Sequence, residues 1–338
     1  MKKQQQIIRE EFFLASDPGI QIFVREVRDG ERQHLQKGPI LLLHGARVPG
    51  VASFDLDVPN ASLAADLASN GHVVYVMDAR GYGKSSRPRE MERPPEENPP
   101  LIRSSEVVRD IAAVVEWIRH RLGVRQVALL GWATGGHWQG YYTALYSDRV
   151  SHLILHNTLY GGTPDHPTLG HGSTNEAPDH PGRFNEAAYG AYRFNTADAL
   201  LPSWDHSIPL EEKTQWRDPA VAQAYVGAAL ASDPTNETRT PPSFRAPSGA
   251  MEDSFYLAIG RQLWDASLIR VPTLILRSER DFWSRQEDAE LLAEHLVHAP
   301  RVRKMTLPDA THYVHLDRPE RGRSAFLKEV VSFLAEGV

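Results

Sequence analysis

Short apolar runs alternate with amphipathic segments along most of the chain. Residues 39–45, PILLLHG, form an apolar run that ends at a glycine, which is typical of a buried parallel strand. Residues 104–122 place apolar side chains on one face at helical spacing. The pattern predicts strands at 11–15, 20–27, 39–43, 72–78, 126–132, 150–157, 272–281 and 302–307, and helices over 61–70, 104–122, 134–147, 286–297 and 319–335. This alternation predicts an α/β fold with a doubly wound, mostly parallel sheet.

The alternation stops over residues 158–267, which are rich in His, Pro, Gly and aromatic residues. Helical patterns recur there near 185–193, 219–231 and 251–265. A loop of that length without secondary structure is improbable in a compact protein. The sequence therefore predicts a helical cap, or lid, domain at 158–267, inserted into a core domain formed by 1–157 and 268–338.

Composition narrows the class of protein. The chain has 338 residues, of which 41% are apolar, enough for one large α/β domain with an insertion. The formal net charge is −6 without a dense basic cluster, which argues against nucleic-acid binding. The absence of cysteine excludes disulfides and thiolate metal sites. Since no apolar run approaches the ~20 residues that span a bilayer, and no apolar segment of a secretory signal follows the first ten residues, we expect a cytoplasmic protein without membrane contact.

Candidate chemistry gathers where predicted strands end, which is where ligands bind in such sheets. The strand at 39–43 is followed by His44, Gly45, Ala46 and Arg47, and the strand at 126–130 by Gly131-Trp132-Ala133-Thr134-Gly135. The two glycines have the spacing of G-x-S-x-G, a turn that presents a nucleophilic serine. The apolar part of the next strand, 273–277, leads to Asp281, and the strand at 302–307 leads to His312. The order of elbow, acid and histidine matches a Ser–Asp–His triad.

Four motifs in order around that elbow resemble the α/β-hydrolase superfamily over nearly the whole chain. They are LLLHG (41–45), DARGYGKSS (78–86), SERDFWS (278–284) and DATHYVHLDRPE (309–320). The resemblance implies that His312 is the general base and acid and that Asp281 orients it. It also implies that the backbone N–H groups of Ala46 and Thr134 form the oxyanion hole. Glu279 and Asp309 are the competing candidates for the acid, and His44 is expected to shape its loop.

One residue departs from the family pattern. Position 133, where a serine is expected, is alanine. One interpretation is a serine hydrolase whose nucleophile has been replaced, which leaves this chain inactive or strongly impaired. The other is a natural alanine, in a binding or signalling member of the fold or in an enzyme whose His312 activates water. The hydroxyl of Thr134 is not expected to substitute, because the elbow presents only its tip residue.

The expected substrate is a small molecule, a carboxylic ester or lactone of medium size and fairly apolar character, with an amide as the alternative. Aromatic residues and one arginine are the candidate substrate-binding residues: Arg47, Trp132, Tyr160, Trp216 and Trp283. No cofactor is implied. The histidines and aspartates of residues 165–180 match no metal-ligand spacing, so no metal site is expected. A homodimer is left open.

Overall fold

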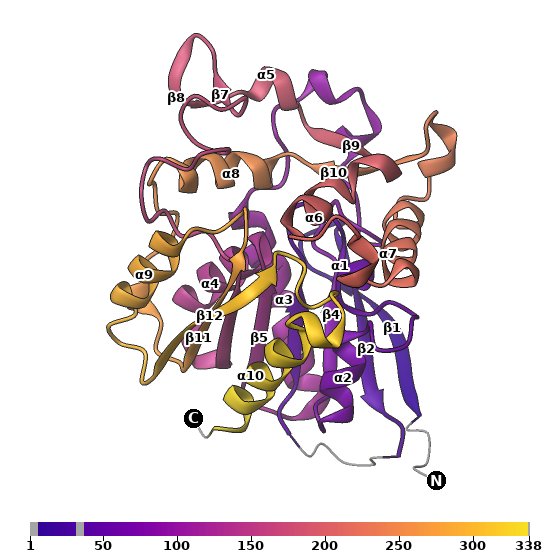
Figure 1. The fold of residues 1–338 in the computed structure, drawn as a ribbon, viewed down its shortest axis with the longest axis vertical. Coiled ribbons are helices and arrows are strands. Elements are labelled where there is room, and N and C mark those ends of the chain that lie inside the picture. Colours follow the sequence, from indigo (N-terminus) through magenta and orange to yellow (C-terminus); the bar gives the residue numbers. More distant parts are fainter. Residues whose placement is uncertain (1–5, 32–36, 337–338) are drawn as a thin grey trace.

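The computed structural model describes residues 6–31 and 37–336, and its centre is a single eight-stranded sheet (Figure 1). The strand order is β1-β2-β4-β3-β5-β6-β11-β12. β1 pairs antiparallel with β2 and β2 antiparallel with β4, and all later neighbours are parallel. The strands are β1 (Ile7–Ala15), β2 (Gln21–Asp29), β3 (Ile40–Leu43), β4 (Val74–Met77), β5 (Val127–Trp132), β6 (Val150–His156), β11 (Thr273–Arg280) and β12 (Val302–Thr311). The predicted mostly parallel α/β sheet is confirmed.

Helices cover both faces of the sheet, as a doubly wound fold requires. In β3, Leu41 and Leu43 belong to one apolar core, and Ile40 and Leu42 belong to a second core on the other face. All four side chains are fully buried, which explains why this strand reads as a continuous apolar run. The helices outside the β6–β11 segment are α1 (Gly50–Phe54), α2 (Leu63–Ser69), α3 (Ser104–Leu122), α4 (Thr134–Leu145), α9 (Gln286–His295) and α10 (Arg323–Ala335).

We call the chain between β6 and β11 the insertion, and Figure 1 shows it above the sheet. It contains helices α5 (Glu186–Tyr189), α6 (Pro202–Ser207), α7 (Pro219–Ala231) and α8 (Gly249–Ala258), and strands β7 (Glu176–Ala177), β8 (His180–Phe184), β9 (Tyr192–Thr196) and β10 (Ser243–Pro247). β7 pairs with β8 and β9 with β10, both antiparallel. The sequence pattern predicted helices but neither of these small sheets. The boundaries of a separate cap domain at 158 and 267 stay a prediction.

Short 3₁₀ helices complete the secondary structure. They are η1 (Arg89–Glu92), η2 (Pro95–Glu97), η3 (Ser147–Arg149), η4 (Ala197–Ala199), η5 (Lys213–Gln215), η6 (Asn236–Thr238), η7 (Ala266–Leu268) and η8 (Pro319–Arg321).

Among the described residues, no helix has both the length and the apolar character needed to cross a membrane.

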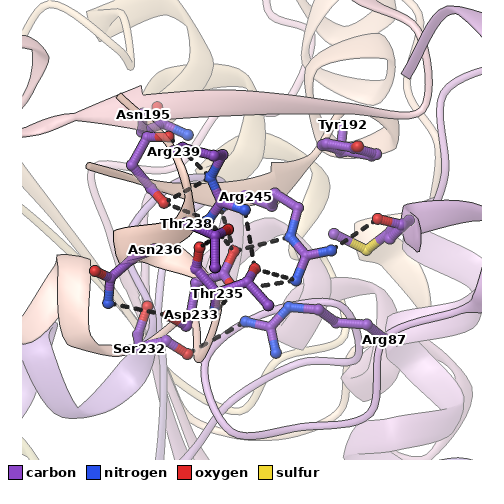
Figure 2. Close-up of polar contacts among 12 residues, drawn as sticks. Arg87, Tyr192, Asn195, Ser232, Asp233, Thr235, Asn236, Thr238, Arg239 and Arg245 are labelled. Carbon is purple, nitrogen blue, oxygen red and sulfur yellow. Dashed lines mark hydrogen bonds and ion pairs between the residues drawn. The ribbon is translucent and has the colours of Figure 1, made fainter. Parts of the chain in front are cut away.

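Buried polar contacts fasten the insertion to the rest of the molecule. Figure 2 shows Asp233, which follows α7 and is fully buried, between Arg239 at 3.0 Å and Arg245 at 2.8 Å. Arg245 Nη1 also donates to the backbone oxygen of Met91 at 2.8 Å, and Arg87 Nη2 donates to that of Ser232 at 3.2 Å. Arg87 and Met91 belong to the loop that follows β4. These two hydrogen bonds therefore connect the insertion to that loop.

Candidate active site

The turn between β5 and α4 has the geometry of a nucleophile elbow. Its tip, Ala133, has φ 53° and ψ −117°, a conformation that residues other than glycine rarely adopt and that costs on the order of 1–3 kcal/mol. The Ala133 N–H donates to the backbone oxygen of His156 at 2.8 Å. A Cβ on Gly135 would overlap the backbone oxygen of Leu43, and a Cβ on Gly131 would overlap the backbone of Gly135. The close approach of backbone segments therefore requires glycine on both sides of the tip.

His312, in the loop after β12, pairs with Asp281, in the loop after β11. The His312 Nδ1 lies 2.5 Å from Asp281 Oδ1, and both side chains are buried. Since a carboxylate only accepts, Nδ1 carries the proton, which leaves Nε2 as the acceptor. The competing acids are engaged elsewhere: Glu279 accepts from the backbone N–H of Asp309, and Asp309 pairs with Arg280. The structure thus brings together His312 and the acid that the sequence pattern favoured.

Several donors converge on the Asp281 carboxylate besides His312. The backbone N–H groups of Trp283 and Ser284 donate at 3.0 and 2.8 Å, and the Ser284 hydroxyl donates at 2.5 Å. Burial by itself would raise the pKa of Asp281, but His312 and these donors outweigh it and lower the pKa below its usual value. Asp281 is therefore ionised at neutral pH and stabilises a positive charge on the imidazole.

Two side chains hold the backbone of His312 in place. Trp132 Nε1 donates to the His312 backbone oxygen at 3.1 Å, and Asn157 Nδ2 donates to the same oxygen at 3.2 Å. Asn157 directly follows β6, has φ 52°, and accepts from the Ser278 N–H at 2.7 Å. Asn157 was not among the residues that the sequence pattern singled out. Its place at the carboxyl end of a buried strand was the available signal.

Two backbone N–H groups near the elbow tip have no hydrogen-bond acceptor among the described residues. They belong to Ala46, after β3, and to Thr134, the first residue of α4. The amino-terminal end of a helix favours negative charge, and two such donors suit a developing oxyanion. The Ala46 oxygen accepts from Tyr82 Oη at 3.2 Å and from Arg193 Nη2 at 3.0 Å. These bonds fix the orientation of the Ala46 peptide.

His44 shapes the loop that carries Ala46. Its Nε2 accepts from the Ala79 N–H at 3.2 Å, so the proton is on Nδ1, which lies 2.7 Å from the Gly45 oxygen. Both ring nitrogens are used inside the protein. His44 is fully buried, and burial lowers its pKa, so the ring is neutral.

One cavity of about 210 Å³ joins the elbow, the histidine and the two N–H groups. Its wall is mostly apolar and aromatic, with two arginines, and it draws on both the core and the insertion. The lining residues are Gly45, Ala46, Arg47, Val48, Trp132, Ala133, Thr134, Arg193, Ser203, Tyr225, Met251, Phe282, Trp283, His312 and Tyr313. A pocket between two parts of a fold, with a few convergent polar groups, is the usual form of a small-molecule site.

The sequence of this region matches a known family. Residues 38–319 match the family model described as alpha/beta hydrolase fold, which covers most of the chain. The chain belongs to the α/β-hydrolase family.

Relatives by sequence match this α/β hydrolase over a limited segment. The 1-acylglycerol-3-phosphate O-acyltransferase ABHD5 of Sus scrofa is 36% identical over 135 residues, which is 39% of this chain and 32% of that protein. The Homo sapiens protein of the same name is 35% identical over the same shares. The match therefore spans about a third of the length of these relatives.

Solved structures resemble this α/β hydrolase over nearly its whole length. The esterase RhEst1 from Rhodococcus sp. ECU1013 has a TM-score of 0.61 and 19% identity, covering 97% of this chain and 99% of that one. The enol-lactonase from Burkholderia xenovorans LB400 has a TM-score of 0.58 and 18% identity, covering 96% and 100%. At these identities the likeness concerns the fold.

Two predicted substrate-binding residues of this α/β hydrolase lie outside the cavity lining. The Tyr160 hydroxyl lies 3.1 Å from His295 Nδ1 and accepts from the Ala266 N–H at 3.1 Å. The Trp216 Nε1 donates to Asp317 Oδ2 at 3.2 Å. Both rings are buried, so they contribute to the packed core and not to the cavity wall. Arg47, Trp132 and Trp283 do line the cavity, and Arg193, from β9, is a lining residue that sequence analysis missed.

Proposed function

We propose that the cavity receives the carbonyl group of a carboxylic ester or lactone, and that position 133 is the nucleophile position of this site. One observation carries the proposal: His312, the elbow tip and the residues of two backbone N–H groups without protein acceptors all border one cavity, and Asp281 pairs with His312 from behind it. These are the parts that acyl transfer requires, apart from the attacking atom.

The roles of the residues follow from their chemistry. The carbonyl oxygen of the ligand points toward the N–H groups of Ala46 and Thr134. With a serine at position 133, His312 Nε2 takes the proton of the hydroxyl and later passes it to the leaving group. Asp281 keeps the imidazole in the required tautomer. The methyl group of Ala133 cannot attack, so the chain as it stands binds the ester without forming an acyl-enzyme.

The cavity of about 210 Å³ is smaller than the roughly 300–1,000 Å³ of most ligand pockets, so it suits a compact, fairly apolar acyl or alcohol group and a substrate of medium size at most. The names of similar proteins, an O-acyltransferase, an esterase and an enol-lactonase, all concern acyl-oxygen chemistry, which supports an ester or lactone over an amide.

A second candidate function follows from Ala133 itself. The His312 Nε2 has no partner among the described residues, so it is available to a water molecule near the bound carbonyl. In that case the alanine form hydrolyses its substrate directly, through general base catalysis without a covalent intermediate. If the alanine form hydrolyses no substrate and Ala133→Ser does not restore hydrolysis, the site acts in binding or signalling.

The experiment compares the alanine chain with Ala133→Ser on a panel of p-nitrophenyl esters, lactones and matched amides. The proposal expects the serine form to hydrolyse esters or lactones faster by a factor on the order of 10⁶, the cost of losing such a nucleophile. Turnover by the alanine form that disappears in His312→Ala would support the second candidate. If both forms are folded and inert on every substrate, the hydrolase proposal is wrong.

A further inference from the structure

Two arginines reach the cavity from different parts of the fold. Arg47 follows Ala46 in the loop after β3, and Arg193 belongs to β9 of the insertion. Both side chains are half-buried, and no aspartate or glutamate is among the residues that line the cavity. Within residues 6–31 and 37–336, no carboxylate lies within 4.0 Å of either guanidinium.

Their observed partners are neutral backbone oxygens. Arg193 Nη2 donates to the Ala46 oxygen at 3.0 Å, and Arg47 Nη2 donates to the Ala199 oxygen. The Nε atoms of both arginines are buried and have no protein partner. A buried donor without an acceptor is costly, on the order of 1–3 kcal/mol, and native proteins rarely keep one without a role.

Two other residues that line the cavity also have a buried hydrogen-bond donor without a protein acceptor. The Trp283 Nε1 and the Thr134 hydroxyl are buried and have no protein partner. The two arginines therefore give the cavity wall a formal double positive charge, and no carboxylate among the lining residues balances it.

Several other arginines of the protein are paired with carboxylates. Arg239 and Arg245 share Asp233 (Figure 2), and Arg80 pairs with Asp110. Arg193 differs: burial lowers its pKa, and the positive charge of Arg47 lowers it further. Since a guanidinium stays protonated in proteins, two such charges on the wall of one cavity favour an anion there.

We propose that Arg47 and Arg193 bind an anionic group, a carboxylate or a phosphate, that the ligand carries beside its ester or lactone. This proposal rests on the proposed function only in assuming that the ligand also carries an ester or lactone. Binding of the anionic group itself requires no bond cleavage. Arg193 contacts Ala46 itself, so the anionic group lies on the side of the cavity formed by the loop after β3. A guanidinium suits both anions because its planar donors match two oxygens at once.

The test is binding of matched ligands to the alanine chain, measured by isothermal titration calorimetry. The anionic ligand is monoethyl adipate, and its neutral counterpart is the primary amide, ethyl 6-amino-6-oxohexanoate. A third ligand, ethyl 4-phosphonooxybutanoate, carries a phosphate. We expect at least one anionic ligand to bind roughly tenfold to hundredfold more tightly than the amide, the range for hydrogen bonds to charged groups. The tighter of the two anions identifies the group that the site prefers.

Variants separate recognition from a structural role. Arg47→Gln and Arg193→Gln keep a donor for the neighbouring backbone oxygen, and each should reduce the anion preference at least tenfold. Arg125→Gln, at an exposed position before β5, should leave it unchanged. Circular dichroism and melting temperature establish that each variant is folded.

Two results would overturn the anion site: equal affinity for anionic and neutral ligands, or a preference that survives in folded Arg47→Gln and Arg193→Gln. Absence of binding of either anion at 10 mM would also overturn it. The activity of Ala133→Ser tests the proposed hydrolase function separately from the binding of the anion. An inert Ala133→Ser variant that keeps the arginine-dependent preference would leave the anion site standing and remove the hydrolytic role.

Discussion

Asn157 Nδ2 donates a hydrogen bond to the backbone oxygen of His312 at 3.2 Å, so the end of β6 supports the loop that follows β12. The same amide reaches the Ser278 hydroxyl at 3.1 Å, and its oxygen accepts from the Ser278 N–H at 2.7 Å. One buried side chain thus ties the end of β6 to β11 and to the histidine loop. The position of His312 depends on this link as well as on Asp281.

Replacing Asn157 with alanine should destabilise the protein by about 2 kcal/mol, because it leaves buried backbone and hydroxyl groups without partners. Urea denaturation of both forms measures the free energy of unfolding. Asn236→Ala is the control, since Asn236 Nδ2 makes one side-chain bond, to the Asp233 oxygen. If Asn157→Ala costs no more than the control, Asn157 does not hold the loop.

Asp281→Asn, made in the Ala133→Ser background, should lower kcat by a factor on the order of 10³–10⁴, because the amide favours the wrong tautomer of His312. The Michaelis constant should change little. Asp309→Asn is the matched control: Asp309 is exposed and pairs with Arg280. A comparable loss of kcat in the control variant, or none in Asp281→Asn, would contradict the assignment of the acid.

His137 should make the fold sensitive to acid. Burial lowers its pKa to about 4, and its ring lies between Trp264 Nε1 at 3.0 Å and the Ser104 hydroxyl at 2.9 Å. An unfolded histidine binds a proton near pH 6.5, whereas the folded one binds it near pH 4, so stability falls as the pH drops through that range. His137→Gln should lose less stability than the parent between pH 7 and 5. The exposed His120→Gln should follow the parent, and identical pH profiles for all three forms would refute the prediction.

Asp317 should have the opposite dependence on pH. Burial raises its pKa to about 7, although Thr311, Trp204 and Trp216 all donate to it and oppose that shift. The folded state therefore keeps a proton that the unfolded state releases near pH 4, and stability falls as the pH rises from about 4 to 7. Asp317→Asn removes this effect. The unfolding free energy of the parent relative to the variant should decline with pH, by at most about 1.4 kcal/mol per unit. A difference that stays constant from pH 5 to 8 would argue against it.

The sheet was predictable because parallel strands buried on both faces leave an apolar signature. The run at residues 39–43 contains β3 (Ile40–Leu43), and the amphipathic pattern of 104–122 became α3 (Ser104–Leu122). The elbow, Asp281 and His312 were also recognisable, because their motifs occur in the same order as in the α/β-hydrolase superfamily that they resemble. These features depend on local sequence.

The insertion was less predictable because its contacts are distant in sequence. The helix expected near 185–193 ends at Tyr189, and β9 then pairs with β10, whose residues lie about fifty positions later. Arg193 reaches the cavity from this strand, and no spacing rule connects it with Ala46. Tyr160 and Trp216 were chosen for their aromatic rings alone, and such rings serve packing as readily as binding.

Covalent labelling tests the central claim most directly, namely that position 133 is the tip of a functional elbow facing His312. The alanine chain, Ala133→Ser and the double variant Ala133→Ser/His312→Ala are treated with a fluorophosphonate, and the adduct is located by mass spectrometry of peptides. We predict one adduct, on the new residue at position 133 of the single variant, none on the alanine chain and strongly reduced labelling of the double variant. A folded Ala133→Ser variant that stays unlabelled, or that is labelled equally well without His312, would contradict the account.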